Sequence, residues 1–168
     1  YNSFSNWSVN GGTVDLIGNG YFDFLPGHGL YIDLDGSTNS SGLMGHFETL
    51  AKGDYTLSFS LAGNQRNGAT ETTTASVSVA TGTDLVSQSF SLNQTDGFTK
   101  FSFDFSISDL LAPAATNITF GSSSADNIGM LLDDVVLEKH VAAVSEPASF
   151  ALLGLGLLGL AAARRRQV

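Results

Sequence analysis

The fold is decided by the stretch Tyr55-Thr56-Leu57-Ser58-Phe59-Ser60-Leu61. Apolar side chains alternate with hydroxyl side chains along it, and a similar alternation returns in Phe101-Ser102-Phe103-Asp104-Phe105-Ser106-Ile107. Because successive side chains of a strand point to opposite faces, both segments predict strands with one buried face and one hydrated face. We expect a core between two sheets that contains Leu57, Phe59, Phe101, Phe103 and Phe105.

Turn dipeptides divide the chain into segments of strand length. They are Asn10-Gly11, Asn19-Gly20, Asp35-Gly36, Asn67-Gly68 and Asp96-Gly97, and their residues tolerate positive φ. Eight or nine short strands between such turns predict an all-β fold, an antiparallel jelly roll or β-sandwich. The last strand is expected at residues 130–138, with Leu131, Val135 and Leu137 on one face and Leu132 and Val136 on the other.

Composition limits the partners of the chain. The 168 residues contain no Cys and have a net charge of −9. The absence of Cys excludes a disulfide framework and thiol chemistry. A strongly acidic chain cannot neutralise phosphates, so we expect no nucleic-acid partner. The acidic surface suits cations or neutral polymers instead.

The C-terminal end has a different pattern. Val144-Ser145-Glu146-Pro147 precedes sixteen uncharged residues, 148–163, which are followed by Arg164-Arg165-Arg166. As a helix the uncharged run would rise about 24 Å, short of the roughly 30 Å hydrocarbon core of a bilayer. The arginines favour a cytoplasmic position for this end. We expect a sandwich at residues 1–138, a linker at 139–144 and a tail with a short transmembrane helix at 145–168.

This tail resembles the PEP-CTERM sorting signal of Gram-negative bacteria, in which a Pro-Glu-Pro motif, a hydrophobic helix and an arginine cluster follow one another. Ser145 replaces the first proline, so Glu146 and Pro147 carry the motif together with the arginines at 164–166. The resemblance implies export, transient anchoring in the inner membrane and processing by an exosortase. The cell surface or the extracellular matrix is then the final location. A buried core helix and a plain tail anchor are the alternatives, and the glycines at 154, 156 and 159 disfavour the core helix.

The body resembles galactose-binding-domain-like jelly rolls, in the segments 7–9, 12–18, 31–36, 53–59 and Leu132-Asp133-Asp134-Val135. This resemblance implies a non-catalytic carbohydrate-binding module. The chain begins at Tyr1 without a signal peptide, and we expect that its N-terminal part is truncated.

Candidate ligand-binding residues are concentrated near the N-terminus. Aromatic rings can stack on the apolar face of a sugar while polar neighbours bind its hydroxyls. The candidates are Trp7, Tyr21, Phe22 and Tyr31, together with Asn64 and Arg66 of a polar loop. For Trp7, a role as an anchor of the core is the alternative.

A calcium ion is the only cofactor that the sequence suggests. Asp133 and Asp134 are acidic neighbours in an otherwise apolar strand and could ligate Ca²⁺, or could instead accept hydrogen bonds from backbone amides. The stretch Asp33-Leu34-Asp35-Gly36 lacks the EF-hand spacing. The three histidines lack the spacing of a zinc site.

Two classes of function remain open. The first is an exported surface or matrix protein, not an enzyme, which binds or builds extracellular polysaccharide as in a biofilm. The alternative is a secreted glycoside hydrolase acting on such polymers. A hydrolase needs a cleft with two carboxyl groups within about 10 Å of each other. No nucleophile elbow or phosphate-binding loop is present in the sequence.

Overall fold

The computed structural model describes residues 1–38, 42–66, 70–79, 82–122 and 126–141. Every regular element in these ranges is a β-strand. In the same ranges, no helix has the length and apolar character needed to cross a membrane. The expected tail helix falls in residues 142–168, which lie outside the described residues.

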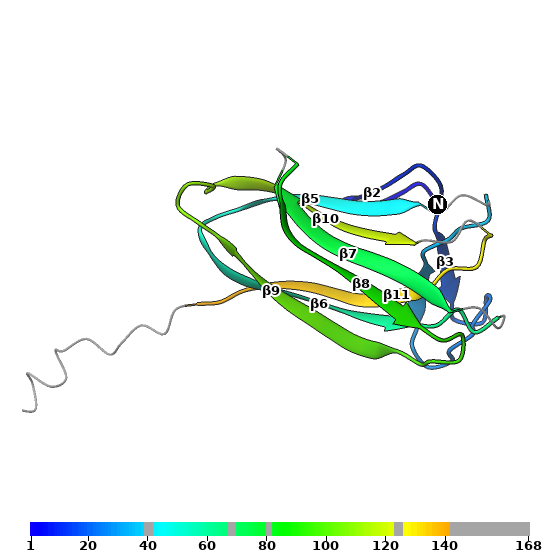
Figure 1. The fold of residues 1–168 in the computed structure, drawn as a ribbon. Coiled ribbons are helices and arrows are strands. Elements are labelled where there is room, and N and C mark those ends of the chain that lie inside the picture. The colour runs from blue at the N-terminus through cyan, green and yellow to red at the C-terminus, as the bar shows by residue number, and fades with distance from the viewer. Residues whose placement is uncertain (39–41, 67–69, 80–81, 123–125, 142–168) are drawn as a thin grey trace, which may run out of the picture.

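The described residues contain eleven strands, which form two antiparallel sheets that pack face to face (Figure 1). The strands are β1 (Ser3–Phe4), β2 (Trp7–Asn10), β3 (Asp15–Gly18), β4 (Leu30–Asp33), β5 (Leu43–Leu50), β6 (Gly53–Ala62), β7 (Glu71–Val79), β8 (Asp84–Leu92), β9 (Thr99–Ile107), β10 (Ala114–Ser122) and β11 (Leu131–Lys139). One sheet has the order β1-β2-β5-β10-β7-β8 and the other β3-β4-β11-β6-β9. The predicted all-β antiparallel sandwich is confirmed.

The strand order from β4 onward is that of an eight-stranded jelly roll. The chain crosses from one sheet to the other at each connection from β4 to β7, and again from β8 to β11. Among β4 to β11, only β7 and β8 are successive strands that pair within one sheet, and this gives the orders β4-β11-β6-β9 and β5-β10-β7-β8. The early strands extend this unit, because β1 and β2 add to the β5 edge and β3 adds to the β4 edge.

The core lies between the sheets and is rich in phenylalanine. Leu57 and Phe59 are fully buried, and Phe103 and Phe105 are also buried. Phe101 is only partly buried and packs against the edge of this core. It contacts the Phe90 ring at a centroid distance of 4.7 Å, and both residues belong to strands that end their sheets, β9 and β8. The predicted core is therefore confirmed, with Phe101 at its rim.

The predicted facing of the last strand is wrong, because β11 contains a bulge. Leu132 pairs with Leu61 and Leu137 pairs with Leu57, so both face the core although they are five positions apart, an odd offset that would place them on opposite faces of a regular strand. The register shifts between Asp133 and Val136, where one extra residue is inserted. A simple period of two cannot predict such an insertion.

A second, smaller apolar cluster covers the far face of the five-stranded sheet. Ile17, Tyr31, Ala62 and Leu131 form it, and Phe24, Leu25 and Phe98 pack on it. Tyr31 and Leu131 lie on the strand face opposite the main core, because the adjacent Ile32 and Leu132 point into the sandwich. The loop between β3 and β4 is thus anchored on the outside of the sandwich.

Candidate functional site

The loop at residues 19–29 begins with a tight turn. Gly18 and Tyr21 exchange two backbone hydrogen bonds of 2.9 and 3.1 Å. The central residues, Asn19 and Gly20, have φ angles of 51° and 85°, as a type I′ turn requires. The Asn-Gly turn signal of the sequence is confirmed here, and its effect is to place Tyr21 and Phe22 at the tip of the loop.

Two aromatic rings of this loop are exposed. Tyr21 is 67% exposed and Phe22 is 61% exposed. Their rings meet edge to face with centroids 5.0 Å apart. Large exposed rings fixed against one another provide an apolar surface that water leaves readily when a ligand binds.

Tyr31 supports the loop from below. Its ring is buried, and its hydroxyl donates to the Asp23 carboxylate at 3.3 Å and accepts from the Leu25 amide at 3.0 Å. Burial raises the pKa of the Tyr31 hydroxyl above its ordinary value. Tyr31 therefore cannot stack on a ligand, and its place is in the scaffold of the loop.

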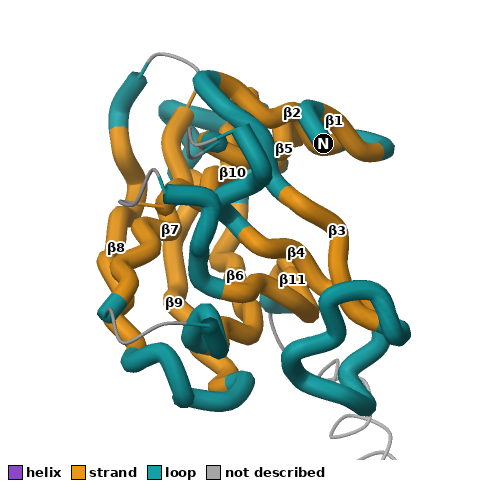
Figure 2. Tube along the Cα trace, turned by 90° about the vertical axis from the view of Figure 1, so that its right-hand side faces the viewer, coloured by secondary structure: helices purple, strands orange, loops and turns teal. Residues whose placement is uncertain are grey.

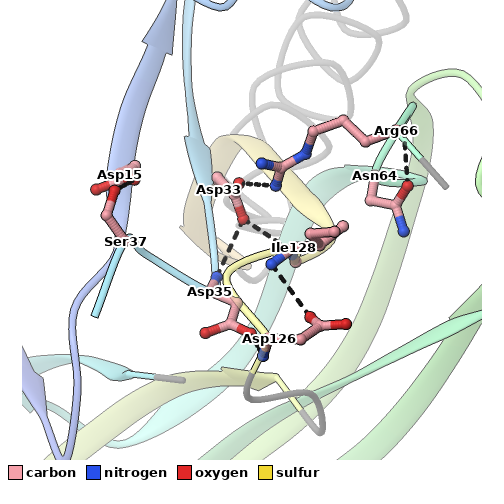
Figure 3. A network of polar contacts seen from close by, with 9 residues as sticks. Asp15, Asp33, Asp35, Ser37, Asn64, Arg66, Asp126 and Ile128 are labelled. Carbon is pink, nitrogen blue, oxygen red and sulfur yellow. Dashed lines mark hydrogen bonds and ion pairs between the residues drawn. The ribbon is translucent and has the colours of Figure 1, made fainter. Parts of the chain in front are cut away.

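A buried ion pair lies beside the loop. The Arg66 guanidinium bonds to Oδ2 of Asp33, which is 3% exposed, while Arg66 is 27% exposed (Figure 3). The other oxygen of Asp33 accepts from the amides of Asp35 at 3.1 Å and Gly129 at 3.0 Å. Arg66 also lies 5.2 Å from the Phe24 ring centroid. The position of Arg66 is thus fixed from two sides.

Asn64 belongs to the same network. It is fully buried, and its Oδ1 accepts from the Arg66 amide at 2.8 Å (Figure 3). This is an Asx turn, in which a side chain replaces a backbone acceptor. Asn64 therefore shapes the loop that presents Arg66 and does not face a ligand itself.

These elements enclose a cavity of about 490 Å³, which we name the loop pocket. Its apolar lining residues are Tyr1, Leu16, Ile17, Tyr21, Phe22 and Phe24. Its polar lining residues are Asp15, Asp33, Ser37, Arg66 and Asn127. Three of the candidates expected from the sequence, Tyr21, Phe22 and Arg66, meet in this one pocket.

Sequence reasoning missed the acidic side of the loop pocket. Asp15 and Asp33 are direct cross-strand partners in β3 and β4, so their side chains share a face. Asp15 accepts a hydrogen bond from the Ser37 hydroxyl (Figure 3). No local signal in the sequence indicates this pairing, because the Asn19-Gly20 turn pairs Gly18 with Tyr21, whereas β3 pairs with β4 across the loop at residues 19–29.

Asp33 has an unusual ionisation. Burial raises its pKa to about 7, although the Arg66 charge and the two backbone amides act in the opposite direction. The nearby Asp15 carboxylate raises it further. Since the folded-state pKa exceeds that of the unfolded chain, Asp33 favours folding at low pH and loses this contribution as the pH rises through about 7.

We therefore expect Asp33→Asn to change the pH dependence of stability. The melting temperature of the variant relative to the wild type should rise between about pH 4 and pH 7 and level off above that. Thermal unfolding of both proteins in a buffer series measures the difference, in which the common titration of the other carboxylates cancels. A difference that stays constant with pH, or falls as the pH rises, would contradict the raised pKa.

Trp7 lies away from the loop pocket. It is partly buried, and its ring packs against Phe120 and His46 at centroid distances of 6.1 and 5.2 Å. The contact with Phe120 agrees with the alternative that Trp7 anchors the core. The structure does not bring it together with Tyr21 and Phe22.

The pair Asp133 and Asp134 lies at the bulge of β11. Asp133 Oδ1 accepts from the Asp134 amide at 2.8 Å, and Asp134 has a φ of 52°. This contact is the amide-binding role that the sequence offered as the alternative to a metal site. In the parts of the chain that are described, no group of three or more acidic, His or Cys side chains is placed to hold a metal ion. Calcium binding by this pair stays a prediction.

Comparison with known proteins identifies the tail and the fold. Residues 143–166 match the PEP-CTERM protein-sorting motif. This motif indicates export with transit through the membrane. No curated protein matches the chain.

Several solved structures with a similar fold contain carbohydrate-binding modules. TmCBM61 in complex with β-1,4-galactotriose is 18% identical, with 83% of this chain and 92% of that chain covered and a TM-score of 0.58. The CBM22-1 xylan-binding domain of Paenibacillus barcinonensis Xyn10C is 12% identical over 85% and 91% of the chains, with a TM-score of 0.53. The CBM22-1–GH10 modules of Clostridium thermocellum xylanase 10B are 16% identical over 84% of this chain and 27% of theirs, with a TM-score of 0.54. At these identities the likeness shows the fold alone.

Proposed function

We propose that residues 1–138 form a non-catalytic carbohydrate-binding module, and that the loop pocket is its binding site. The observation that carries the proposal is the pair of exposed rings, Tyr21 and Phe22, at the mouth of a polar cavity. The similar modules named above are described as bound to galactotriose or as xylan-binding. A neutral polysaccharide outside the cell is the ligand class that fits an acidic, exported chain.

The chemistry of the pocket suits a sugar. Tyr21 and Phe22 supply ring faces for the apolar C–H face of a pyranose. Asp15, Ser37 and Asn127 line the same cavity and offer acceptors and donors for its hydroxyls. Arg66 adds further donors, and its ion pair with Asp33 keeps the guanidinium in place before a ligand arrives.

The aromatic pair provides the test of this proposal. In affinity electrophoresis against galactan, xylan and other neutral polysaccharides, we expect the wild type to be retarded. The double variant Tyr21→Ala/Phe22→Ala should bind about tenfold more weakly or worse, because buried aromatic anchors contribute most to such interfaces. Leu110→Ala is the matched control, since Leu110 is 97% exposed and lies outside the pocket. Equal retardation of the double variant and the control would contradict the proposal.

One observation favours the alternative function, a glycoside hydrolase. The loop pocket holds two carboxyl groups on one face, Asp15 and Asp33, and Asp33 has a raised pKa, as a general acid needs. Both oxygens of Asp33, however, already accept hydrogen bonds, and the side chain is 3% exposed. A general acid must reach the glycosidic oxygen, so the geometry supports binding better. Release of reducing sugar by the wild type and its loss in Asp15→Asn would reverse this conclusion.

The tail is proposed to sort the protein and to contribute nothing to the stability of the module. An exosortase is the proposed processing partner, and residues 139–144 are the proposed linker between module and tail. The proposed sorting residues are Ser145, Glu146, Pro147, Arg164, Arg165 and Arg166. Deletion of residues 145–168 should leave the melting temperature unchanged and abolish envelope retention in the native host. Replacing the three arginines by Gln should weaken envelope retention and leave the melting temperature unchanged. Unfolding of the truncated protein would show instead that the tail is structural.

A further inference from the structure

Two further hollows lie near the loop pocket. One of about 200 Å³, the edge hollow, opens between the two sheets and is lined by Trp7, Leu16, Leu30, Ile32 and Asp134 among others. Another of about 300 Å³, the hairpin hollow, is lined by Phe4, Asn6, Trp7, Ser8, His46 and Phe47, with Gly45. Phe47 is 64% exposed, so the hairpin hollow also presents a solvent-facing ring.

The three hollows are neighbours along one side of the sandwich. Leu16 lines both the loop pocket and the edge hollow, and Trp7 lines both the edge hollow and the hairpin hollow. The topology explains this, because β1 and β2 end one sheet and β3 ends the other. Figure 2 shows these strands on the same side of the molecule, with the β3–β4 loop below them.

We infer that the ligand is an extended, uncharged oligosaccharide that runs from the loop pocket over Leu16 and Trp7 to Phe47. This inference rests on the proposed function and deepens it, since a single terminal sugar would occupy the loop pocket alone. Exposed rings stand at both ends of the path, and Leu30, which lines the edge hollow, is 51% exposed. The path therefore offers alternating apolar and polar surface along its length, as a sugar chain presents.

The charges along the path determine the class of oligosaccharide. Asp15 lines the loop pocket, and Asp133 and Asp134 line the edge hollow. The cations that line the loop pocket are both paired, Arg66 with Asp33 and the Tyr1 ammonium with Asp15 at 3.9 Å. Among the described residues that line the path, these carboxylates outnumber the cations, and such a surface repels uronic or sulfated polymers. An uncharged chain is the ligand that meets no such repulsion.

Trp7 is placed to report on this path. It is the only tryptophan of the sequence. Its ring is held between Phe120 and His46, and Nδ1 of His46 lies 2.7 Å from the Asn6 carbonyl oxygen. Because the Trp7 ring is held in place and lines both the edge hollow and the hairpin hollow, an oligosaccharide that passes over Trp7 must change the surroundings of the ring. Intrinsic fluorescence therefore measures occupancy of the path directly.

The test titrates the full chain with β-1,4-linked galacto- and xylo-oligosaccharides, from the monosaccharide to the hexasaccharide. We expect affinity to rise about tenfold or more from the disaccharide to the hexasaccharide, and Trp7 emission to change with the longer members only. Phe47→Ala should remove most of the gain with length and leave disaccharide affinity unchanged. Leu110→Ala should resemble the wild type at every length.

The outcomes separate this inference from the proposed function. Binding that depends on Tyr21 and Phe22 but shows no gain with length, or no change in Trp7 emission, would overturn the inference and leave the loop pocket as a site for one sugar. Equal losses at all lengths in Phe47→Ala would also overturn it. Binding to none of the oligosaccharides and to none of the neutral polysaccharides would contradict the proposed function, and the inference with it.

Discussion

Replacing Phe59 by alanine should lower the free energy of unfolding by about 3–5 kcal/mol, the usual loss for a buried phenylalanine. Phe59 is fully buried. Four rings surround it at centroid distances of 5.0 to 6.3 Å, namely Phe90, Phe101, Phe103 and Phe120. Two of these rings come from each sheet. The substitution would therefore leave a cavity between the two sheets, at the place where rings from both sheets contact Phe59.

Chemical denaturation followed by circular dichroism measures this loss. The matched control is Phe47→Ala, which removes a ring that is 64% exposed and should change stability by about 0.5 kcal/mol or less. A similar, small loss for both variants would show that Phe59 does not hold the sheets together.

Gly18→Ala should destabilise the protein by about 2–5 kcal/mol and abolish carbohydrate binding. Gly18 has a φ of 106°, and a Cβ atom there would lie 2.1 Å from the Gly29 carbonyl oxygen. The left-handed conformation costs about 1–2 kcal/mol for a residue with a side chain, and the clash with backbone adds about 1–3 kcal/mol. Gly18 and Gly29 lie at the two ends of the β3–β4 loop. The added methyl group would push these ends apart and so move Tyr21 and Phe22 away from the loop pocket.

The control for this prediction is Gly11→Ala. Gly11 has a φ of 81°, but a Cβ atom there would meet nothing within 4 Å. Gly11→Ala should lose only the stability that the positive φ angle costs a residue with a side chain, and it should keep its affinity for polysaccharide. Retained affinity in Gly18→Ala would mean that the close approach of the two loop ends does not shape the binding site.

Local patterns in the sequence were sufficient to predict the fold. The alternation at residues 55–61 predicts strand β6 with its buried face, because period-two patterning depends only on neighbouring residues. The Asn19-Gly20 turn follows from the tolerance of both residues for positive φ. The sorting motif was recognisable for a similar reason, since its three parts are adjacent in the chain.

The site depended on contacts between distant residues and could be predicted only in part. Arg66 and Asp33 are 33 positions apart in the chain, and nothing local indicates their pairing. The exposure of Tyr21 and Phe22 could be inferred from a turn-rich segment, but the burial of Tyr31 depends on the loop that folds over it. The bulge in β11 likewise appears only in the register of this strand against its distant neighbour β6.

Amide chemical shifts of the full chain, titrated with the oligosaccharide that binds most tightly, test the proposed binding site most directly. The account predicts that the largest shifts fall in residues 15–24, in residues 33–37 and at Arg66 and Asn127, which line or support the loop pocket. Large shifts confined to the opposite edge of the six-stranded sheet, at β7 and β8, with none in the β3–β4 loop, would contradict it.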